Sequence, residues 1–431
     1  MRLSKVPGAL PLAGHLHRLV RNPLDFLASV HEHGDLLELK LGPQRVFLPC
    51  HGELAGDVLR DSATFDKGGF AYDRARLLFG SSGIGTCDYA HHRTLRPLVQ
   101  PAFARPRLER YADIMREEVD ALVDSWHPGD VLDVKRVMDG LFCRVTARTL
   151  FSSDLGGAAV DEVGHCIPII VDGVFARMMD PTGLWPRVPT PANRRFDDAM
   201  TRLAALTADI LARHRRSGVT DHGDVLSALI AAGLSDTEIH EQIMVLLVSG
   251  METTATTIAW TLNLLCDHPD VEDRMRTELA TSERAEYTRR VINEVLRLYP
   301  TAWLFSRRTT CDTTLGGHHI PARSMIAVSP FVLHRDPKVF PDPARFDPDR
   351  FLELNPVQRQ AYIPFGAGAR KCIGDVFGMT QAVIALAGIL SRWTLRRAPG
   401  VTPRVVPKAV LVPANLSLIA EARCTSTTSN A

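Results

Sequence analysis

A long apolar segment between residues 235 and 267 sets the strongest limit on how this chain can fold. It opens with Ser235 and, three positions on, Glu238, which is the form of a capping box at a helix N-terminus. Apolar residues then cover every face, so the predicted helix must be buried. It should stop where His268 precedes Pro269. At about 1.5 Å per residue the helix would span roughly 45–50 Å, the width of a whole domain.

The middle of this predicted helix carries polar residues that a buried helix rarely accepts. Gly250 lowers helix propensity, and the hydroxyls of Thr253 and Thr254 can bond back to helix carbonyls and bend the helix. A buried and unpartnered Glu252 would cost several kcal/mol or take up a proton. The segment is therefore either a kink with satisfied polar groups or part of a functional site.

The rest of the chain predicts a mainly helical protein with small β-sheets, an α+β class. Strand patterns lie near both ends, in the alternation over 35–41 and in 305–330. Apolar residues recur every three to four positions in three further segments, 108–126, 196–216 and 271–299. No polar hinge divides residues 1–423, which we expect to form a single domain. The small polar residues 424–431 are expected to form a disordered tail.

Composition excludes several classes of protein. The 431 residues are 45% hydrophobic and 23% charged, and 50 basic residues balance 49 acidic ones. That balance gives no reason to expect a nucleic-acid or membrane-surface partner. No stretch reaches the roughly 20 apolar residues of a membrane helix, and the 8 cysteines form no CxxC pair. We therefore expect a cytoplasmic protein with free thiols.

The segment from Pro364 to Gly374, PFGAGARKCIG, is the most informative in the chain. Its glycines let the backbone turn tightly and approach a flat ligand. Cys372 follows two cations, Arg370 and Lys371, which favour a thiolate. A helical pattern resumes just after it, so the sulfur should lie near a helix N-terminus. Such a thiolate can bind a metal axially, whereas a lone cysteine in a turn would normally be structural.

This segment resembles the heme-binding signature of the cytochrome P450 family. The matching residues are Phe365, Gly368, Arg370, Cys372 and Gly374. Four other segments resemble the family in order and spacing: a helix at 92–96, an oxygen-activation stretch at 249–254, an ExxR helix at 294–297 and the segment 346–351. The resemblance covers nearly the whole chain. It implies the P450 fold, in which a long central helix lies over heme b.

The resemblance implies that Cys372 is the axial ligand of the heme iron. A thiolate in that position pushes electron density onto iron and favours O–O cleavage. Phe365, Gly374 and Gly250 would contact the same cofactor, and Gly250 would leave room for O2 against the central helix. The implied activity is insertion of one oxygen atom of O2 into a C–H bond.

Heme b carries two propionates, which need cationic partners. His92 and Arg96 lie at i and i+4 and so share one helix face, and Arg370 lies two residues before the predicted ligand. By resemblance Arg307 is the fourth partner, with Arg308 as the alternative. Each charge-assisted bond would contribute ~1.5–3 kcal/mol.

Glu294 and Arg297 lie at i and i+3 and can pair on one helix face. Alone, such a pair would indicate a solvated helix surface. Together with Arg350, and by resemblance to the family, it predicts a buried ion network that holds the loop around Cys372. Loss of one member should cost ~3–5 kcal/mol.

By resemblance, Thr253 and Glu252 are the catalytic residues on the distal side. The reaction needs two protons, and a hydroxyl beside a carboxylate can supply them. The chain departs from the usual family pattern in two places. Ser249 stands where Ala is frequent, and Gly378 and Gln381 replace Ala and Glu after the predicted ligand.

Apolar residues dominate the segments that resemble the family's substrate contacts. The candidate substrate-binding residues are Phe79, Ile84, Ser249, Trp303, Leu304 and Phe305. Those at 303–305 could equally be core packing. Gly80, Gly83 and Gly85 predict a mobile lid within the 70–86 loop.

An apolar pocket with few charges suits a hydrophobic small molecule. Segments 65–70 and 298–300 are similar to those of bacterial terpene-oxidising members of the family. This similarity favours a terpene of secondary metabolism or antibiotic biosynthesis. Oxidation of a macrolide or polyketide is the alternative.

The motifs leave no room for a flavin or ferredoxin module, so separate proteins, a ferredoxin and its reductase, should donate electrons. Arg93, Arg105, Arg107 and Lys371 are either a docking patch for an acidic ferredoxin or scattered solvated charges. By family default we expect a monomer.

Two other functions remain open from the residues. A peroxygenase would draw its oxygen from hydrogen peroxide, although such members usually lack the acid–threonine pair that Glu252 and Thr253 provide. A non-catalytic heme sensor would need neither this pair nor a large apolar pocket.

Overall fold

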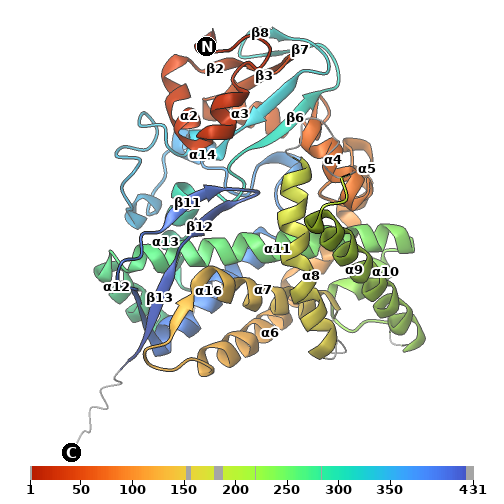
Figure 1. The fold of residues 1–431 in the computed structure, drawn as a ribbon, viewed down its shortest axis with the longest axis vertical. Coiled ribbons are helices and arrows are strands. Elements are labelled where there is room, and N and C mark those ends of the chain that lie inside the picture. The colour runs from red at the N-terminus through yellow and green to blue at the C-terminus, as the bar shows by residue number, and fades with distance from the viewer. Residues whose placement is uncertain (1, 152–156, 179–187, 219, 283, 424–431) are drawn as a thin grey trace, which may run out of the picture.

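A long helix, α11 (Asp236–Leu265), crosses the middle of the molecule, and the other helices pack around it (Figure 1). The computed structural model describes residues 2–151, 157–178, 188–218, 220–282 and 284–423. The predicted tail at 424–431 lies outside these residues.

The start of α11 has the capping box that the sequence predicts. The Glu238 N–H donates to Ser235 Oγ at 3.3 Å, and the Ser235 N–H donates to Glu238 Oε2 at 2.9 Å. By length and composition α11 could cross a membrane, but 72% of its most apolar window is buried inside the protein. Its apolar surface is thus covered by neighbouring helices, as in the core of a folded domain.

Many of the remaining helices pack against α11, and a smaller group lies beside the sheet (Figure 1). Their bounds are α1 (Leu16–Arg21), α2 (Pro23–Val30), α3 (Gly52–Arg60), α4 (Phe70–Phe79), α5 (Tyr89–Val99), α6 (Arg105–Asp124), α7 (Val134–Phe151), α8 (Gly157–Met178), α9 (Pro191–Arg216), α10 (Val225–Ala231), α12 (Pro269–Thr281), α13 (Glu286–Leu298), α14 (Pro330–Leu333), α15 (Pro356–Ala361) and α16 (Asp375–Arg392).

The helical pattern over 271–299 belongs to two helices, α12 and α13, rather than to one. Ser282 is extended, and Ala285 takes a left-handed conformation with φ of 50°. An α-helix cannot continue through such a residue. The apolar period persists across the break because both helices turn their apolar faces to the same core.

The strands expected near the two ends of the chain join in one six-stranded sheet of order β1-β2-β3-β9-β6-β4. Its strands are β1 (Leu3–Lys5), β2 (Leu36–Leu41), β3 (Gln44–Pro49), β4 (Phe65–Asp66), β6 (Phe305–Thr309) and β9 (Met325–Val328). The parallel pairing of β3 with β9 places Val46 opposite Met325. The antiparallel pairing of β4 with β6 brings residues 305–309 beside residues 65–66, which prepares one wall of the site.

Three smaller sheets complete the described structure. One joins β10 (Trp393–Arg397), β13 (Ser417–Ala422) and β5 (Val131–Asp133). Two hairpins are formed by β7 (Thr313–Leu315) with β8 (His318–Ile320) and by β11 (Arg404–Pro407) with β12 (Leu411–Ala414). The Trp260 indole N–H on α11 donates to Leu411 O at 2.7 Å and anchors the β11–β12 hairpin.

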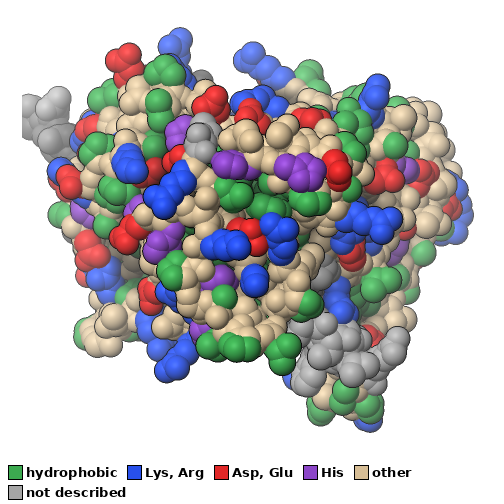
Figure 2. Space-filling view, turned by 90° about the horizontal axis from the view of Figure 1, so that it is seen from above, with side chains coloured by type: hydrophobic (Ala, Val, Ile, Leu, Met, Phe, Trp, Pro, Cys, Tyr) green, Lys and Arg blue, Asp and Glu red, His purple; other side chains and the backbone are tan. Residues whose placement is uncertain are grey.

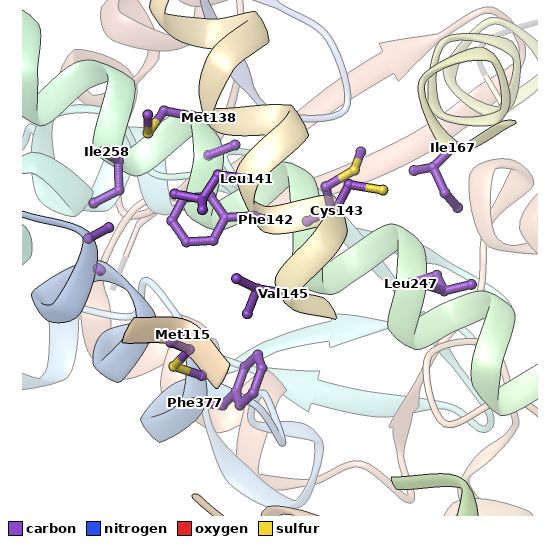
Figure 3. Packing of buried hydrophobic residues seen from close by; sticks show 14 of the residues in the cluster. Met115, Met138, Leu141, Phe142, Cys143, Val145, Ile167, Leu247, Ile258 and Phe377 are labelled. Atoms are coloured by element: carbon purple, nitrogen blue, oxygen red, sulfur yellow. The ribbon is translucent and has the colours of Figure 1, made fainter. Parts of the chain in front are cut away.

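The main core lies between α6, α7, α11 and α16. Figure 3 shows Met115 of α6, Phe142 and Val145 of α7, Ile258 of α11 and Phe377 of α16 gathered in it. Burial of this apolar surface is the main driving force that positions α11 over the loop before α16. On the face seen from the N-terminal strands, acidic, basic and apolar side chains are interspersed (Figure 2).

Candidate active site

A cavity of about 330 Å³ lies between α11 and the loop that precedes α16. Nine of the predicted site residues line it: Ser249, Gly250, Thr253, Phe305, Arg307, Phe365, Arg370, Cys372 and Gly374. They come from α11, β6 and the 364–374 loop. The tertiary structure thus brings three segments that are far apart in the sequence around one cavity.

Backbone bonds and packing hold the cysteine loop against its neighbours. The Cys372 N–H donates to Phe365 O at 2.9 Å, which closes the loop on itself. Gly368 has φ of 68°, and a Cβ there would lie 2.1 Å from the Leu59 carbonyl oxygen on α3. A side chain at that position is therefore excluded by both conformation and space. Only glycine allows the loop to sit against α3.

Cys372 is exposed and lines the cavity, but much of the surface around its sulfur is enclosed by protein. This enclosure raises the pKa of its thiol, while the Gly374 N–H, Arg96 and Lys371 lower it less strongly. The start of α16 at Asp375 places the sulfur just before a helix N-terminus. In the cavity alone the thiol form is favoured, so a bound cation would be needed to hold the thiolate.

The two cations that precede Cys372 do not both face its sulfur. Arg370 turns toward Asp66, with 2.6 Å between Nη2 and Oδ1, and also donates to Cys87 O at 2.9 Å. Lys371 pairs with Asp375 at 2.5 Å. The expectation that Arg370 favours the thiolate directly therefore does not match its position, because its charge is committed to Asp66.

Arg96 supports the cysteine loop from α5. Its guanidinium donates to Lys371 O at 2.5 Å and to Ala369 O at 3.3 Å. His92 lies one turn earlier on α5, is 3% exposed, and is not in the cavity lining. The predicted i, i+4 pair thus lies beside the cavity edge.

Basic side chains converge at one edge of the cavity. Burial, with Arg370, Lys67 and Arg96 close by, lowers the pKa of His92 to about 3. Burial likewise lowers the pKa of Arg307, with Arg370 adding to the effect. The Nε atoms of Arg307 and Arg370 are buried without a hydrogen-bond partner. We call Lys67, His92, Arg307 and Arg370 the cation cluster, in which His92 is uncharged at neutral pH unless an anion binds beside it.

The cation cluster fits the carboxylates of a heme. Orphaned buried donors and mutually repelling cations need anionic partners. Two propionates would supply them at the same edge of the cavity. The same cavity also presents the Cys372 sulfur, which is suited to ligation of a heme iron.

The choice between Arg307 and Arg308 follows from the pleat of β6. Arg307 is 4% exposed and lines the cavity. Arg308 points to the other face of the strand and pairs with Asp73 at 2.6 Å. The structure therefore brings Arg307, and not Arg308, into the cation cluster.

Glu294 and Arg297 form a fully buried bidentate pair on α13. The Nε–Oε2 and Nη2–Oε1 distances are 2.7 and 2.8 Å. Arg350 Nε lies 3.4 Å from Glu294 Oε1. Arg297 also donates to His334 O at 2.9 Å, and His334 Nε2 accepts the Ile363 N–H at 3.0 Å. The network thus reaches the chain one residue before the cysteine segment.

On α11, the hydroxyls of Ser249 and Thr253 face the cavity and also bond to the helix. Thr253 Oγ1 donates to Ser249 O at 2.8 Å, and Ser249 Oγ donates to Val245 O at 2.5 Å. A Cβ at Gly250 would lie 3.2 Å from Thr146 Cγ2 on α7. Gly250 therefore allows close approach of α7 in addition to lining the cavity.

Glu252 lies on a different side of α11 from Thr253. It is 8% exposed and is not in the cavity lining. Burial raises the pKa of its carboxyl to about 7; Asp139 and Asp172 raise it slightly further, whereas Lys135 and Lys408 lower it slightly. A carboxyl with this pKa exchanges its proton near neutral pH.

Four of the predicted substrate contacts lie outside the cavity lining. Phe79 and Ile84 are buried in the main core. Trp303 packs in the core of the N-terminal sheet, where Leu304 also packs, and its indole N–H donates to Lys408 O at 2.9 Å. Among residues 303–305, only Phe305 lines the cavity. Trp303 and Leu304 are therefore core-packing residues, which was the alternative interpretation of this segment.

The expected lid is tied down on α11. The Ser82 N–H donates to Glu241 Oε2 at 2.6 Å, and the Ile84 N–H donates to Gln242 Oε1 at 2.8 Å. A Cβ at Gly80 would lie 1.9 Å from the Glu241 carboxyl. The glycines here serve close packing on α11 rather than marking a detached loop.

Sequence reasoning did not select several residues of the cavity wall. Lys67 and Tyr72 line it beside Arg307, and Thr301 and Ala302 line it just after α13. One sequence feature could have pointed to Lys67 as a site residue: it is a lysine directly after the buried strand β4. Nothing in the sequence showed that this lysine faces Arg307, because β4 and β6 pair only in the folded chain.

Comparison with known proteins agrees with this geometry. The sequence model of the cytochrome P450 family matches residues 5–419, so the chain belongs to that family. A solved structure of a cyanobacterial CYP120A1 with bound retinoic acid has the same fold, with a TM-score of 0.83 and 22% identity over 98% of this chain and 99% of that one. The predicted fold class is confirmed.

Three Streptomyces proteins are similar over nearly the full chain. Cyclooctatin synthase of Streptomyces melanosporofaciens is 46% identical, covering 98% of this chain and 96% of that protein. Cyclooctat-9-en-7-ol 5-monooxygenase of the same organism is 45% identical, with coverages of 92% and 90%. Pentalenene oxygenase of Streptomyces avermitilis is 40% identical, with 94% of each covered.

Family membership confirms two predictions made from the sequence. The chain is a cytochrome P450 monooxygenase, and its cofactor is a heme with thiolate ligation. Cys372, the cysteine of the segment that resembles the family signature, lines the cavity.

Proposed function

We propose that this protein is a bacterial monooxygenase that oxidises a cyclic terpene of secondary metabolism. The observation that carries the proposal is 40–46% identity, over nearly the whole chain, to three Streptomyces P450s that oxidise terpenes. The cavity supports it, since its cations gather at one edge and the remaining wall is mostly apolar or hydroxyl-bearing. Such a wall suits a hydrocarbon or terpene alcohol.

In the proposed mechanism Cys372 would ligate the iron, and His92, Arg96, Arg307 and Arg370 would hold the propionates. Phe365, Gly250 and Gly374 would pack against the cofactor. When bound, the heme supplies the oxidising chemistry that inserts oxygen into a C–H bond. The chain's own residues then place the substrate and control water and protons.

Thr253 Oγ1 is proposed to hold a proton at the cavity wall, on the substrate side of α11. Its bond to Ser249 O orients the hydroxyl. Glu252, the adjacent residue, is proposed to take up and release protons, which a pKa of about 7 permits at neutral pH. Phe305 and Ser249 are proposed substrate contacts, since both line the cavity.

The proposed electron donors are a ferredoxin and its reductase, and we propose a cytoplasmic monomer. Three of the four basic residues expected to dock the donor pair with carboxylates. Arg107 lies 2.8 Å from Asp221, Lys371 lies 2.5 Å from Asp375 and Arg105 lies 3.7 Å from Glu109. Arg93 is exposed against the Tyr89 ring. Docking by charge alone would thus rest mainly on Arg93, and salt should slow the reaction only modestly.

Two measurements test the proposal. The reduced, carbon monoxide-bound protein should show the red-shifted Soret band of a thiolate-ligated heme, and a terpene should shift the resting spectrum to high spin. A macrolide that produces the shift when terpenes do not would overturn the terpene assignment. Turnover with a ferredoxin system should exceed turnover with peroxide alone. Efficient product formation from peroxide without redox proteins would instead establish a peroxygenase.

A further inference from the structure

Lys67 faces the cavity directly after β4, yet its ammonium also reaches a different part of the chain. Nζ donates to Gly85 O at 2.6 Å and lies 3.5 Å from Ile84 O. Nζ also lies 5.7 Å from the centre of the Tyr72 ring. One side chain thus connects the edge of the cavity with the loop between α4 and α5, residues 80–88.

The surroundings of Lys67 leave its charge poorly compensated. Arg307 comes from β6 and Arg370 from the cysteine loop, and both lie close enough to disfavour a further cation. Asp66 already accepts from Arg370 at 2.6 Å and from the Tyr89 N–H at 2.8 Å. His92 and Cys87 are the other titratable groups that face the ammonium. An anion at this edge would offset the repulsion.

The far side of the same loop is fixed by α11. Glu241 and Gln242 accept the N–H groups of Ser82 and Ile84, and Gln242 Nε2 donates to Ser82 O at 2.8 Å. Gln242 is fully buried. The 80–88 loop is therefore clamped between two supports, the α11 side chains and the Lys67 ammonium.

We propose that Lys67 joins a heme propionate to the main chain of the 80–88 loop. An ammonium has three donors; two reach the carbonyls of Gly85 and Ile84, and the third is available to a carboxylate. The bound cofactor holds the ammonium, and the ammonium holds the loop against α11. Lys67 is thus a positioning residue that couples heme retention to loop order, a role separate from that of the four predicted propionate partners.

Two readouts on purified holoenzyme test the coupling. One is the rate of heme transfer to excess apomyoglobin, and the other is hydrogen exchange of the amides in residues 80–88. Lys67→Met should speed both by about tenfold, since it removes a charge-assisted bond. Lys67→Arg keeps the charge and should stay within about twofold of the wild type in both. It also covers the case in which the methionine variant does not fold.

Glu241→Ala is the matched control because it loosens the loop from the α11 side and leaves the cation cluster intact. It should speed exchange around Ser82 without speeding heme transfer. The proposal is overturned if Lys67→Met releases heme at the wild-type rate, or releases heme faster while loop exchange is unchanged. It is also overturned if Lys67→Arg loses as much as Lys67→Met, or if Glu241→Ala releases heme as fast as Lys67→Met does.

Discussion

Glu294 and Arg297, one turn apart on α13, form a bidentate ion pair with both side chains fully buried. Glu294 Oε1 has further partners in the same network: it also accepts the Asp347 N–H at 3.0 Å and lies 3.4 Å from Arg350 Nε. The pair connects α13 to the chain that leads into the cysteine loop. Its integrity should therefore decide whether the heme site forms.

Replacing one member of this pair should strongly destabilise the protein. Glu294→Gln leaves the Arg297 guanidinium buried without a counter-charge, which costs ~3–5 kcal/mol. Urea unfolding and the heme content of the purified protein measure the loss. The control is Arg274→Ala, which breaks an exposed pair with Asp349 and should cost ~1 kcal/mol or less. Equal losses for the two variants would refute a special role for the buried pair.

The two neighbouring glycines of the cysteine loop should respond differently to alanine. Gly366 and Gly368 both have positive φ, 69° and 68°. Gly366→Ala meets open space and should cost only the conformational strain of ~1–2 kcal/mol. Gly368→Ala has the same strain and also places a methyl group against the Leu59 carbonyl. The Gly368→Ala protein should therefore contain less heme than the wild type and less than Gly366→Ala. Heme absorbance per protein measures both, and equal loss would contradict the packing argument.

Thr253→Ala should uncouple electron use from product formation. The variant keeps the cavity but lacks the hydroxyl that we propose holds a proton, so more of the consumed reductant should end as peroxide or water. Product formed per reductant oxidised measures this, and a fall of about tenfold is expected. The control is Thr261→Ala, which removes a hydroxyl with the same helix bond two turns along α11, outside the cavity lining. Unchanged coupling in Thr253→Ala would rule out the proposed role.

The pKa of Glu252 predicts a specific dependence of stability on pH. Folding raises it from 4.5 to about 7, so the folded state holds a proton that the unfolded state has lost between those values. This contribution to stability is full below pH 4.5 and disappears as pH rises through 7, a change of ~3 kcal/mol. Glu252→Gln cannot ionise and should gain stability relative to the wild type at pH 8, but not at pH 4.5.

Urea unfolding of both proteins at the two pH values checks this expectation. Glu286→Gln, on the exposed first turn of α13, is the control and should change little at either pH. A Glu252→Gln variant with the same relative stability at both pH values would show that the carboxyl is not destabilised by burial. The same variant should also slow product formation if Glu252 supplies protons to Thr253.

Short-range features of the site were predictable from the sequence. The capping box at Ser235, the polar centre of α11 and the glycines around Cys372 are all encoded within a few residues of one another. Their chemistry follows from local backbone geometry, which depends little on the rest of the fold. The resemblance to the P450 family rested on such segments, and it is confirmed.

The direction in which individual side chains point was not predictable in the same way. Trp303 and Phe305 are two residues apart, yet the first fills the core of the N-terminal sheet and the second lines the cavity. The glycines of the 80–88 loop suggested mobility, but Glu241 and Gln242 hold that loop on α11. These outcomes depend on which distant element packs against a segment.

The sequence by itself determined the class of enzyme and the cofactor, and it singled out Cys372 as the proposed ligand, because a short signature encodes the turn that presents this residue. Only the tertiary structure decided which residues form the cation cluster and which partner each charged side chain contacts. Lys67, His92, Arg307 and Arg370 lie on four separate segments, and Asp66 takes up the charge of Arg370 that the sequence had directed at the thiolate. Electrostatic effects depend on distance and burial, and chain folding sets both of these between residues far apart in sequence.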